Sequence, residues 1–423
     1  MNLFRLYLEV IKVKIKSKSN NLYDRTIWIL TVVLVSSFCI NNKKLNGSYV
    51  LLGITILAFI LSALKNNGKI TCHIGIMHFF IGVFCLFCFT SAVWAINSGD
   101  AIEKGTTVFE ILICISVFYW HYRCLDNPVR DLLRVLMWSG YVTVIYTFIY
   151  SGYDVIMDIL NSSGRLSSSF DNVNTIGFIC ALTIIIAIYF TVYEKGSLSL
   201  ILVIPSLLLL SACGSRKALI ILFIGIILLF IFKDIGEHKF LSVLKFLSFL
   251  LVFYFAIRFI MQFSLFSGIN ARMEGLIALI TGSGIVDHSA WVREQYIKLG
   301  ISIFKDHPIC GIGVGNAHII NAQTLGDNCY LHNNFVELLA NGGIIGFALY
   351  YSIHFYIIFQ MIRTKAFGSH EGQILFVLLL CIIMADYGFV SYYSKITYFY
   401  FMLIFIYLEN INKRGLSNNV ITE

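Results

Sequence analysis

Proline and charged residues are scarce in this sequence. Of its 423 residues only 3 are proline and 13% are charged, while 58% are apolar and the mean hydropathy is +0.82. Because a soluble domain carries about 25% charged residues, this composition excludes a soluble domain of such length. The apolar runs 217–232 and 240–266 approach or exceed the roughly 20 residues that a membrane-spanning helix needs. We therefore expect an all-α membrane protein in contact with a lipid bilayer.

Signatures for nucleotides and metals are missing as well. The sequence has no P-loop, and the run of Gly311, Gly313 and Gly315 lacks the preceding strand and following helix of a dinucleotide site, so we interpret it as a flexible turn region. Cys85 and Cys88 have the spacing of half a zinc site, but no second pair accompanies them. We expect no cofactor and no metal.

Most of the 11 cysteines lie inside apolar runs, where a cysteine is typically a small core residue. Cys310 and Cys329 differ, because they share one polar segment that is expected outside the cytoplasm. In an oxidising compartment, a disulfide between them is an open alternative. Residues 1–22 are basic and lead into an apolar run without a small-residue cleavage site, so no cleaved signal peptide is expected.

The formal charge of +8 is distributed over alternate connections between the apolar runs. A broad basic surface would suggest a nucleic-acid partner, but this alternation is what the positive-inside rule predicts for a multi-pass membrane protein. Residues 1–22 and 412–423 are then expected in the cytoplasm, and no nucleic acid is expected. The internal cytoplasmic connections carry Lys65 and Lys69, Arg123 and Arg130, Lys195, Lys233 and Lys239, and Arg363 and Lys365.

About twelve apolar segments have lengths near that of a membrane span. The chain divides accordingly into an N-terminal transmembrane bundle of about nine spans (1–266), a large extracytoplasmic loop between spans 9 and 10 (267–334), and C-terminal transmembrane helices with a cytoplasmic tail (335–423). Within the loop, 270–280 and 289–304 show apolar residues at helical spacing, which predicts short amphipathic helices at the membrane surface. The predicted spans are 24–40, 48–64, 73–95, 106–120, 131–151, 173–193, 197–213, 217–233, 240–266, 335–362, 371–388 and 395–411.

His332 lies where a polar segment meets an apolar one, so its imidazole is placed near the membrane edge. Asn334 followed by Glu337 predicts a helix start at which the amide caps free backbone N–H groups and the carboxylate reaches back. The positive end of that helix disfavours an imidazolium, so the ring would stay neutral and able to accept a proton near pH 7. His332 is therefore either a base or an uninvolved residue at a loop end, and Glu337 either orients it or only caps the helix.

Arg216 and Arg293 are expected on the same outer side as His332. Arg216 precedes an apolar run, where an arginine must sit at the membrane interface or face a polar cavity. Arg293 lies on the predicted surface helix beside Glu294. Because the planar donor fork of arginine suits phosphate oxygens, the two can form an anion site. The alternatives are a snorkelling anchor for Arg216 and a solvent-facing or Glu294-paired role for Arg293.

Five motifs occur in a recognisable order between about residues 160 and 350. They are Gly164-Arg165-Leu166 with Asp171-Asn172-Val173-Asn174; Gly214-Ser215-Arg216-Lys217-Ala218; Trp291-Val292-Arg293; Phe304-Lys305-Asp306-His307-Pro308-Ile309-Cys310-Gly311-Ile312-Gly313-Val314-Gly315-Asn316; and His332-Asn333 with Gly342-Gly343-Ile344-Ile345-Gly346. In this order the chain resembles the O-antigen ligase and O-antigen polymerase superfamily of bacterial membrane glycosyltransferases. The first 150 residues match that family only in their hydrophobic profile.

The resemblance implies a metal-independent, inverting transfer of a glycan from a polyprenyl diphosphate carrier to an acceptor glycan hydroxyl. It places the reaction on the periplasmic or external face of the bacterial plasma (inner) membrane. Arg216 and Arg293 match the family arginines that hold the diphosphate, and His332 matches the histidine that takes the acceptor proton. Substrate-binding roles are implied for Asn333, Arg165 and Asn174.

Several functions stay open at this point. A polymerase moves the growing chain onto the next carrier-linked repeat unit, and the sequence from 332 to 347 looks closer to polymerases; a ligase moves the chain onto lipid A core. A protein O-glycosyltransferase of the same superfamily is a further option, and a polysaccharide flippase or secondary transporter is an alternative of another class. A chain-length regulator and a separate flippase are candidate protein partners.

Overall fold

The structure, a computed structural model, describes residues 22–40, 48–69, 72–162, 164–166, 172–194, 196–234, 251 and 288–420. Every regular element in these residues is an α-helix or a short 3₁₀ helix, which confirms the all-α prediction. The predicted surface helix at 270–280 and, apart from Leu251, the predicted span at 240–266 lie outside the described residues. The division into an N-terminal bundle (1–266), an extracytoplasmic loop (267–334) and C-terminal helices (335–423) stays a prediction.

The described residues form a series of helices. In chain order they are Leu22–Ile40, α2 (Ser48–Lys65), α3 (Ile76–Thr90), η1 (Ser91–Val93), α4 (Ser98–Tyr122), α5 (Pro128–Ser151), α6 (Tyr153–Asn161), α7 (Val173–Glu194), η2 (Ser197–Leu200), α8 (Val203–Cys213), α9 (Arg216–Asp234), α12 (His288–Asp306), α13 (Ala317–Leu325), α14 (Asn334–Arg363), η4 (Ala366–Gly368), α15 (His370–Ala385) and α16 (Lys395–Val420).

Five described helices are long and apolar enough to cross a membrane, and three shorter apolar helices accompany them. The number twelve is thus not confirmed. Two predicted short spans differ from the structure: α4 extends to 25 residues because Asn97 caps its polar first turns, and the segment 197–213 is divided into η2 and the 11-residue α8. The five long helices are Leu22–Ile40, Ile76–Val93, Pro128–Ser151, Val173–Glu194 and Asn334–Arg363.

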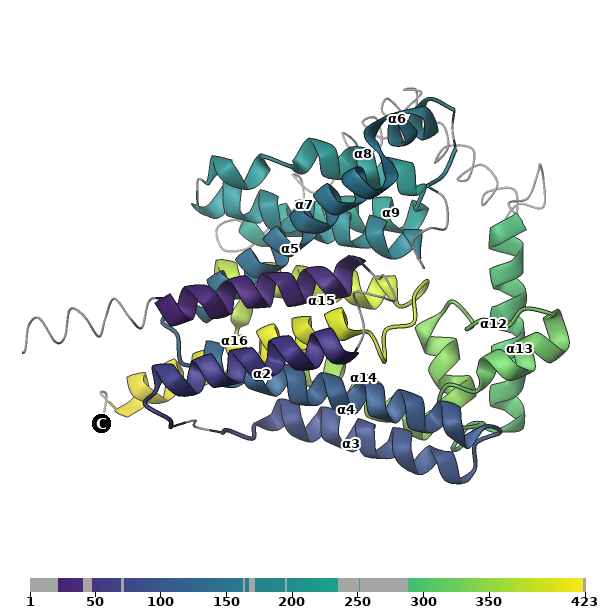
Figure 1. Cartoon of the computed structure of the whole chain (residues 1–423). Helices are drawn as coiled ribbons and strands as arrows, with labels where there is room; N and C mark the ends of the chain where they lie inside the picture. Colours follow the sequence, from purple (N-terminus) through teal and green to yellow (C-terminus); the bar gives the residue numbers. More distant parts are fainter. Residues whose placement is uncertain are drawn as a thin grey trace, which may run out of the picture.

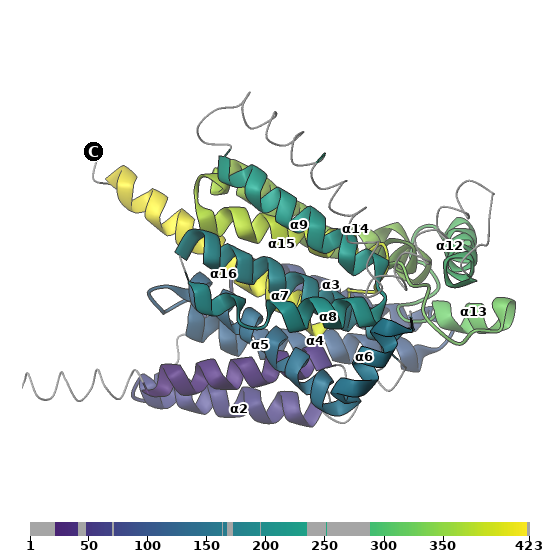
Figure 2. The same cartoon turned by 90° about the horizontal axis from the view of Figure 1, so that it is seen from above.

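The long helices lie side by side and run between two ends of one bundle, as Figure 1 shows. Helix α3 packs on α4 and α14, and α7 packs on both α8 and α9 (Figure 2). Helix α12 runs across the bundle end that lies opposite the C-terminus, and α13 lies beside it (Figure 1). The helix predicted at 289–304 is present as α12, while its place at a membrane surface stays a prediction, and α13 is an additional helix that the sequence pattern did not predict.

A small apolar core fixes α12 to the start of α14. Tyr296 and Ile303 of α12 are buried against Leu331 and Val336, next to Ile312 and Ala317. This core is separate from the large one that fills the helix bundle. Because Leu331 directly precedes His332, the packing that holds α12 also sets where His332 lies.

Helix α14 is broken at Gly343, whose φ of 59° and ψ of −161° are not helical. The break frees backbone groups that would otherwise pair within the helix. A preceding segment pairs with four backbone groups around the break, so the broken helix and that segment form one unit. The four hydrogen bonds run from Ile344 N–H to Pro308 O (2.9 Å), from Ile345 N–H to Ile309 O (3.2 Å), from Ile312 N–H to Ala340 O (3.1 Å) and from Gly313 N–H to Asn341 O (2.9 Å).

The turn region predicted at Gly311, Gly313 and Gly315 is present, and it is tightly packed. All three glycines are buried and have positive φ, and a Cβ on Gly311 would come within 2.4 Å of the Asn341 backbone. The glycines are needed because the segment passes directly against other backbone, where no side chain fits. The segment is also bonded to the turn after α3, through hydrogen bonds from Trp94 Nε1 to Cys310 O and from Ile96 N–H to Ile312 O.

Gly343→Ala is expected to lower stability by roughly 2 to 5 kcal/mol, because only glycine adopts this backbone conformation readily and a new Cβ must also be accommodated. An ideal Cβ there would lie 2.3 Å from Ile309 O. The measurement is the thermal unfolding midpoint of the purified protein in detergent. The matched control is Gly53→Ala on α2, where a Cβ meets nothing within 4 Å. Equal midpoints for the two variants would contradict the role assigned to Gly343.

Candidate functional site

His332 is held in an uncommon backbone conformation between two aromatic rings. Its φ is 55°, in the left-handed region that histidine, asparagine and aspartate adopt more often than other non-glycine residues. The imidazole lies 4.2 Å from the Tyr330 ring centroid and stacks on Tyr296 at 5.9 Å with an interplanar angle of 14°. Tyr296 is itself fixed, since its hydroxyl donates to Asp327 Oδ2 at 2.8 Å. These contacts give His332 a defined orientation at the start of α14.

The helix that follows His332 is capped by Asn333, so the prediction that Asn334 is the cap is wrong by one residue. Asn333 Oδ1 accepts from Val336 N–H at 3.1 Å. Asn334 instead begins α14, and its backbone N–H donates to Asp386 O at 2.7 Å. Its side-chain oxygen accepts from the N–H of Ser391 (2.8 Å). Asn334 is thus a buried link to the end of α15, whereas the substrate contact expected for Asn333 stays a prediction.

Glu337 is buried in the first turn of α14 and its carboxylate reaches back, as predicted, although to a different residue. Oε2 accepts from Leu331 N–H at 2.7 Å, and Oε1 accepts from Asn341 Nδ2 at 2.8 Å. The first bond fixes the residue directly before His332. Asn341 Oδ1 in turn accepts from the N–H groups of Asn316 and Ala317, which begin α13. Glu337 therefore orients the backbone around His332 and not the imidazole itself.

Two cationic side chains, Lys217 and Arg293, act on His332, and Arg216 lies next to Lys217. Arg216 and Lys217 begin α9, and Arg293 lies in α12. Burial is the largest cause that lowers the pKa of His332 to about 4, and the positive charges of Arg293 and Lys217 lower it further. The imidazole is therefore neutral near pH 7, as predicted, but for a reason that the sequence did not show. Of the three residues predicted to be catalytic, the structure therefore places Arg293 beside His332, and Arg216 acts on the neighbouring Lys217.

A sharp turn places the two α9 cations at the site. Helix α8 ends at Cys213, Gly214 adopts φ 58°, and α9 starts at Arg216. Arg165 supports this turn because its Nε donates to Cys213 O at 3.0 Å. Lys217 extends toward the end of α15, where Nζ donates to Tyr387 O at 3.2 Å. The cations thus occupy a fixed turn at the same end of the bundle as α12 (Figure 2).

A hydrogen-bonded chain connects Arg165 and Asn174 with His332. Arg165 donates to Asn174 Oδ1 at 2.8 Å, and Asn174 N–H donates to Asn172 Oδ1 at 3.0 Å. Asn172 Nδ2 then donates to the Tyr330 hydroxyl at 3.0 Å, and the Tyr330 ring contacts His332. Arg165 and Asn174 therefore belong to the framework of this site, and direct substrate contact by either residue stays a prediction.

Sequence reasoning missed Lys217, Tyr330 and Tyr296 as site residues. Lys217 follows Arg216, and two adjacent cations at the start of an apolar run signal that a polar environment exists there. The tyrosines carry no such signal, because 23 tyrosines occur in the chain and nothing local distinguishes these two. Only the folded arrangement shows that they hold the imidazole from two sides.

The disulfide considered between Cys310 and Cys329 is not formed, and both cysteines are free. Cys329 Sγ lies 3.4 Å from the Tyr296 hydroxyl and 3.5 Å from Asn321 Nδ2. Cys310 lies in the segment that pairs with the broken α14, where its carbonyl oxygen accepts from Trp94 Nε1. The two cysteines thus have different neighbours.

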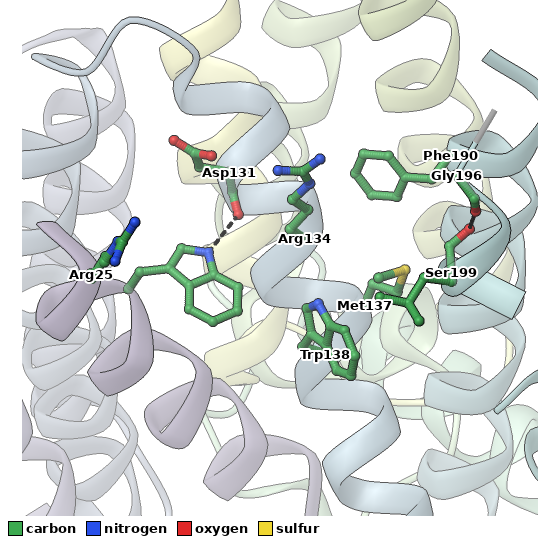
Figure 3. Close-up of a pocket in the computed structure, with 10 residues that line it drawn as sticks. Arg25, Asp131, Arg134, Met137, Trp138, Phe190, Gly196 and Ser199 are labelled. Carbon is green, nitrogen blue, oxygen red and sulfur yellow. Dashed lines mark hydrogen bonds between the residues drawn. The ribbon is translucent and has the colours of Figure 1, made fainter. Parts of the chain in front are cut away.

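A larger cavity of about 520 Å³ lies away from these residues (Figure 3). It is formed by the start of the Leu22–Ile40 helix, by α5, and by the chain around the end of α7. Arg25, Asp131, Arg134 and Trp138 are among its lining residues, and Trp28 Nε1 donates to Asp131 O at 3.3 Å. None of the predicted site residues lines it.

Comparison with known families agrees with the site geometry. Residues 198–351 match the sequence model of the family described as O-antigen ligase. The matched segment contains Arg216, Arg293 and His332, whereas Arg165 and Asn174 precede it. No curated protein matches the chain. The match confirms the resemblance to the O-antigen ligase and polymerase superfamily and supports a membrane enzyme of the glycosyltransferase type.

Proposed function

We propose that this protein transfers a glycan from a polyprenyl diphosphate to a hydroxyl of an acceptor glycan on the extracytoplasmic face of the bacterial plasma membrane, with inversion at the anomeric carbon. The main support is that Lys217 and Arg293 act on a neutral His332, with Arg216 next to Lys217. One arrangement thus supplies both a site for an anion and a group that can accept a proton. The lipid bilayer would hold the carrier's prenyl tail beside the bundle.

The reaction replaces one carbon–oxygen bond with another. The acceptor oxygen attacks the anomeric carbon as the bond from that carbon to the diphosphate oxygen breaks, and the departing oxygen keeps the bonding electron pair. Negative charge therefore grows on the diphosphate, where the guanidinium groups of Arg216 and Arg293 and the Lys217 ammonium stabilise it. The proton of the acceptor hydroxyl passes to His332, which is neutral and able to take it.

The bound donor would also change His332 as a base. Arg293 and Lys217 lower the pKa of the free histidine, so a diphosphate placed among the same cations offsets their charge and raises that pKa. A base works best when its pKa lies near the working pH. Donor binding thus makes the histidine a stronger base at the moment when a glycan is ready for transfer.

A pH dependence follows from this coupling. The imidazole accepts a proton only when neutral, so the rate falls as pH falls through its pKa. We expect kcat/KM for the donor, which reports the free protein, to fall only near pH 4, whereas kcat should begin to fall at a higher pH. Both profiles are measured with purified protein and carrier-linked donor. Acid limbs at the same pH in both profiles would contradict the coupling.

Within this reaction type we propose polymerisation of repeat units of a surface polysaccharide such as O-antigen or capsule, because the stretch from His332 to Phe347 looks closer to polymerases. The matching family description favours the alternative, transfer of the finished chain to lipid A core by a ligase. Deletion of the gene followed by glycan analysis distinguishes the two. Single repeat units on lipid A core would indicate a lost polymerase, and carrier-linked polymer beside bare core would indicate a lost ligase.

A further inference from the structure

A second polar cavity, of about 280 Å³, shares the Tyr330 side chain with the His332 site. Tyr330 lines this cavity and also contacts the imidazole, so the cavity adjoins the catalytic residue through one aromatic ring. Its volume is near the lower end of roughly 300 to 1,000 Å³ that is usual for small-molecule sites. The other walls come from the first turns of α4 (Asp100, Glu103, Lys104), from α13 (His318), and from the turn before α16 (Tyr392, Tyr393).

Tyr392 leaves an unsatisfied hydroxyl at this cavity. The residue is fully buried, and its hydroxyl has no hydrogen-bond partner in the described part of the chain. Its backbone is fixed on both sides, since its N–H donates to Asn334 Oδ1 (3.2 Å) and its carbonyl accepts from the Tyr398 hydroxyl (2.6 Å). Buried polar groups in native proteins are nearly always paired, so an unpaired hydroxyl at a cavity wall indicates a ligand or solvent partner.

A second unpaired oxygen belongs to Asp100. Its Oδ2 is buried and accepts no hydrogen bond from the described residues, although His318 Nε2 lies 3.7 Å away. Neighbouring Glu103 is 68% exposed at its side chain and pairs with Lys104 at 3.1 Å. Carboxylate oxygens with free acceptor positions suit a ligand that donates several O–H groups. A metal ion is the alternative, but among the described residues no group of three histidine, cysteine, aspartate or glutamate side chains is placed to hold one.

The charge of this cavity is opposite to that of the diphosphate site. Asp100, Glu103 and Glu337 contribute carboxylates against one ammonium, that of Lys104, which lies 4.8 Å from the Tyr393 ring centroid. A diphosphate would be repelled here and attracted to Arg216, Lys217 and Arg293. A neutral sugar has hydroxyl groups for the carboxylates and an apolar ring face for the tyrosines, so it fits this cavity better than an anion does.

We infer that this cavity binds the terminal sugar of the acceptor glycan and presents its hydroxyl past Tyr330 to His332. The inference rests on the proposed function, because it assigns the second substrate of that reaction. Donor and acceptor then occupy sites of opposite charge with the imidazole between them. Such an arrangement keeps a carrier diphosphate out of the acceptor position and sets which of the two glycans is attacked.

The test is binding of a defined probe to the full-length protein in lipid nanodiscs. The probe is the repeat-unit oligosaccharide released by mild acid from the carrier lipid of the bacterium that encodes the protein, and saturation-transfer NMR measures its affinity. We expect binding by the wild type and an approximately tenfold weaker affinity for Glu103→Gln and Tyr392→Phe, since each change removes a hydrogen bond to the sugar. The control Tyr356→Phe, which alters α14 far from the cavity, should bind as the wild type does.

Transfer assays on the same proteins separate this inference from the proposed function. Both variants should raise KM for the acceptor and leave donor binding unchanged. Wild-type probe binding without any glycan transfer would overturn the proposed function and leave the sugar site standing. The Glu103 side chain is exposed, so misfolding would not explain a loss of binding in Glu103→Gln. An unchanged acceptor KM and probe affinity in this variant would overturn the sugar site. Absence of probe binding to the wild type would overturn it as well.

Discussion

His332→Asn is expected to slow glycan transfer by roughly 10²- to 10⁴-fold, the range that loss of one general base produces. Asparagine is the sharper substitution because it tolerates the positive φ of 55° at this position, whereas alanine would add backbone strain. An amide side chain cannot accept the acceptor proton. Donor binding should largely survive, because in the proposed reaction the cations of α9 and α12 hold the diphosphate. The measurement is single-turnover transfer by purified protein, with donor affinity determined separately.

His288→Ala is the matched control for this experiment. His288 is an exposed histidine at the start of α12, where it stacks on Trp291 and has no assigned role. Its replacement should leave transfer within about twofold of the wild type, as is usual for a surface position outside the site. Near-normal turnover in His332→Asn would remove the histidine from the mechanism. Lost donor binding with normal saturated turnover would instead assign it to the diphosphate site.

Arg293→Ala is expected to weaken donor use by roughly 10- to 100-fold, since a charge-assisted hydrogen bond contributes about 1.5 to 3 kcal/mol. Arg293→Lys keeps the charge without the planar fork and should lie between alanine and the wild type. A second effect distinguishes Arg293 from a solvent-facing arginine without a role in the reaction. Its charge lowers the pKa of His332, so Arg293→Ala should raise that pKa and move the acid limb of kcat/KM to higher pH.

Lys298→Ala provides the control on the same helix. Lys298 is 63% exposed at its side chain and pairs with Glu294 at 2.7 Å, one turn beyond Arg293. Exposed ion pairs of this kind contribute little, so donor use should not change measurably. If Arg293→Ala left both donor use and the pH profile unaltered, the residue would be a surface cation without a part in the reaction.

Individual apolar helices could be predicted from the sequence because each is a local run of apolar residues or has apolar residues at helical spacing. The span predicted at 173–193 corresponds to α7, Val173–Glu194, and the helix predicted at 289–304 corresponds to α12. Hydropathy did not show the break in α14. The adjacent Gly342 and Gly343 disfavour a regular helix, but hydropathy does not register this, and the segment that pairs with the broken helix begins more than 30 positions earlier.

The three catalytic candidates could be named from their motifs, but their surroundings could not. Asn333 and Asn334 have the same capping ability, and the choice between them depends on Asp386, which lies 52 positions beyond Asn334. The aromatic contacts of His332 likewise require α12 to fold back on the chain before α14. Composition and spacing therefore predict which residue types take part, while the depressed pKa of the histidine arises only from tertiary burial and from cations on other helices.

The hydrogen bonds between the turn after α3 and the segment from Cys310 to Asn316 have a consequence for biosynthesis. Asn97 N–H donates to Asn316 Oδ1 at 2.6 Å, across 219 positions of the chain. At a translation rate of roughly 5 to 20 residues per second, Asn97 leaves the ribosome roughly 10 to 45 s before its partner. During that interval this turn lacks those partners, so a chain truncated before α13 cannot form these hydrogen bonds. The proposed active site is thus completed among the last steps of membrane assembly.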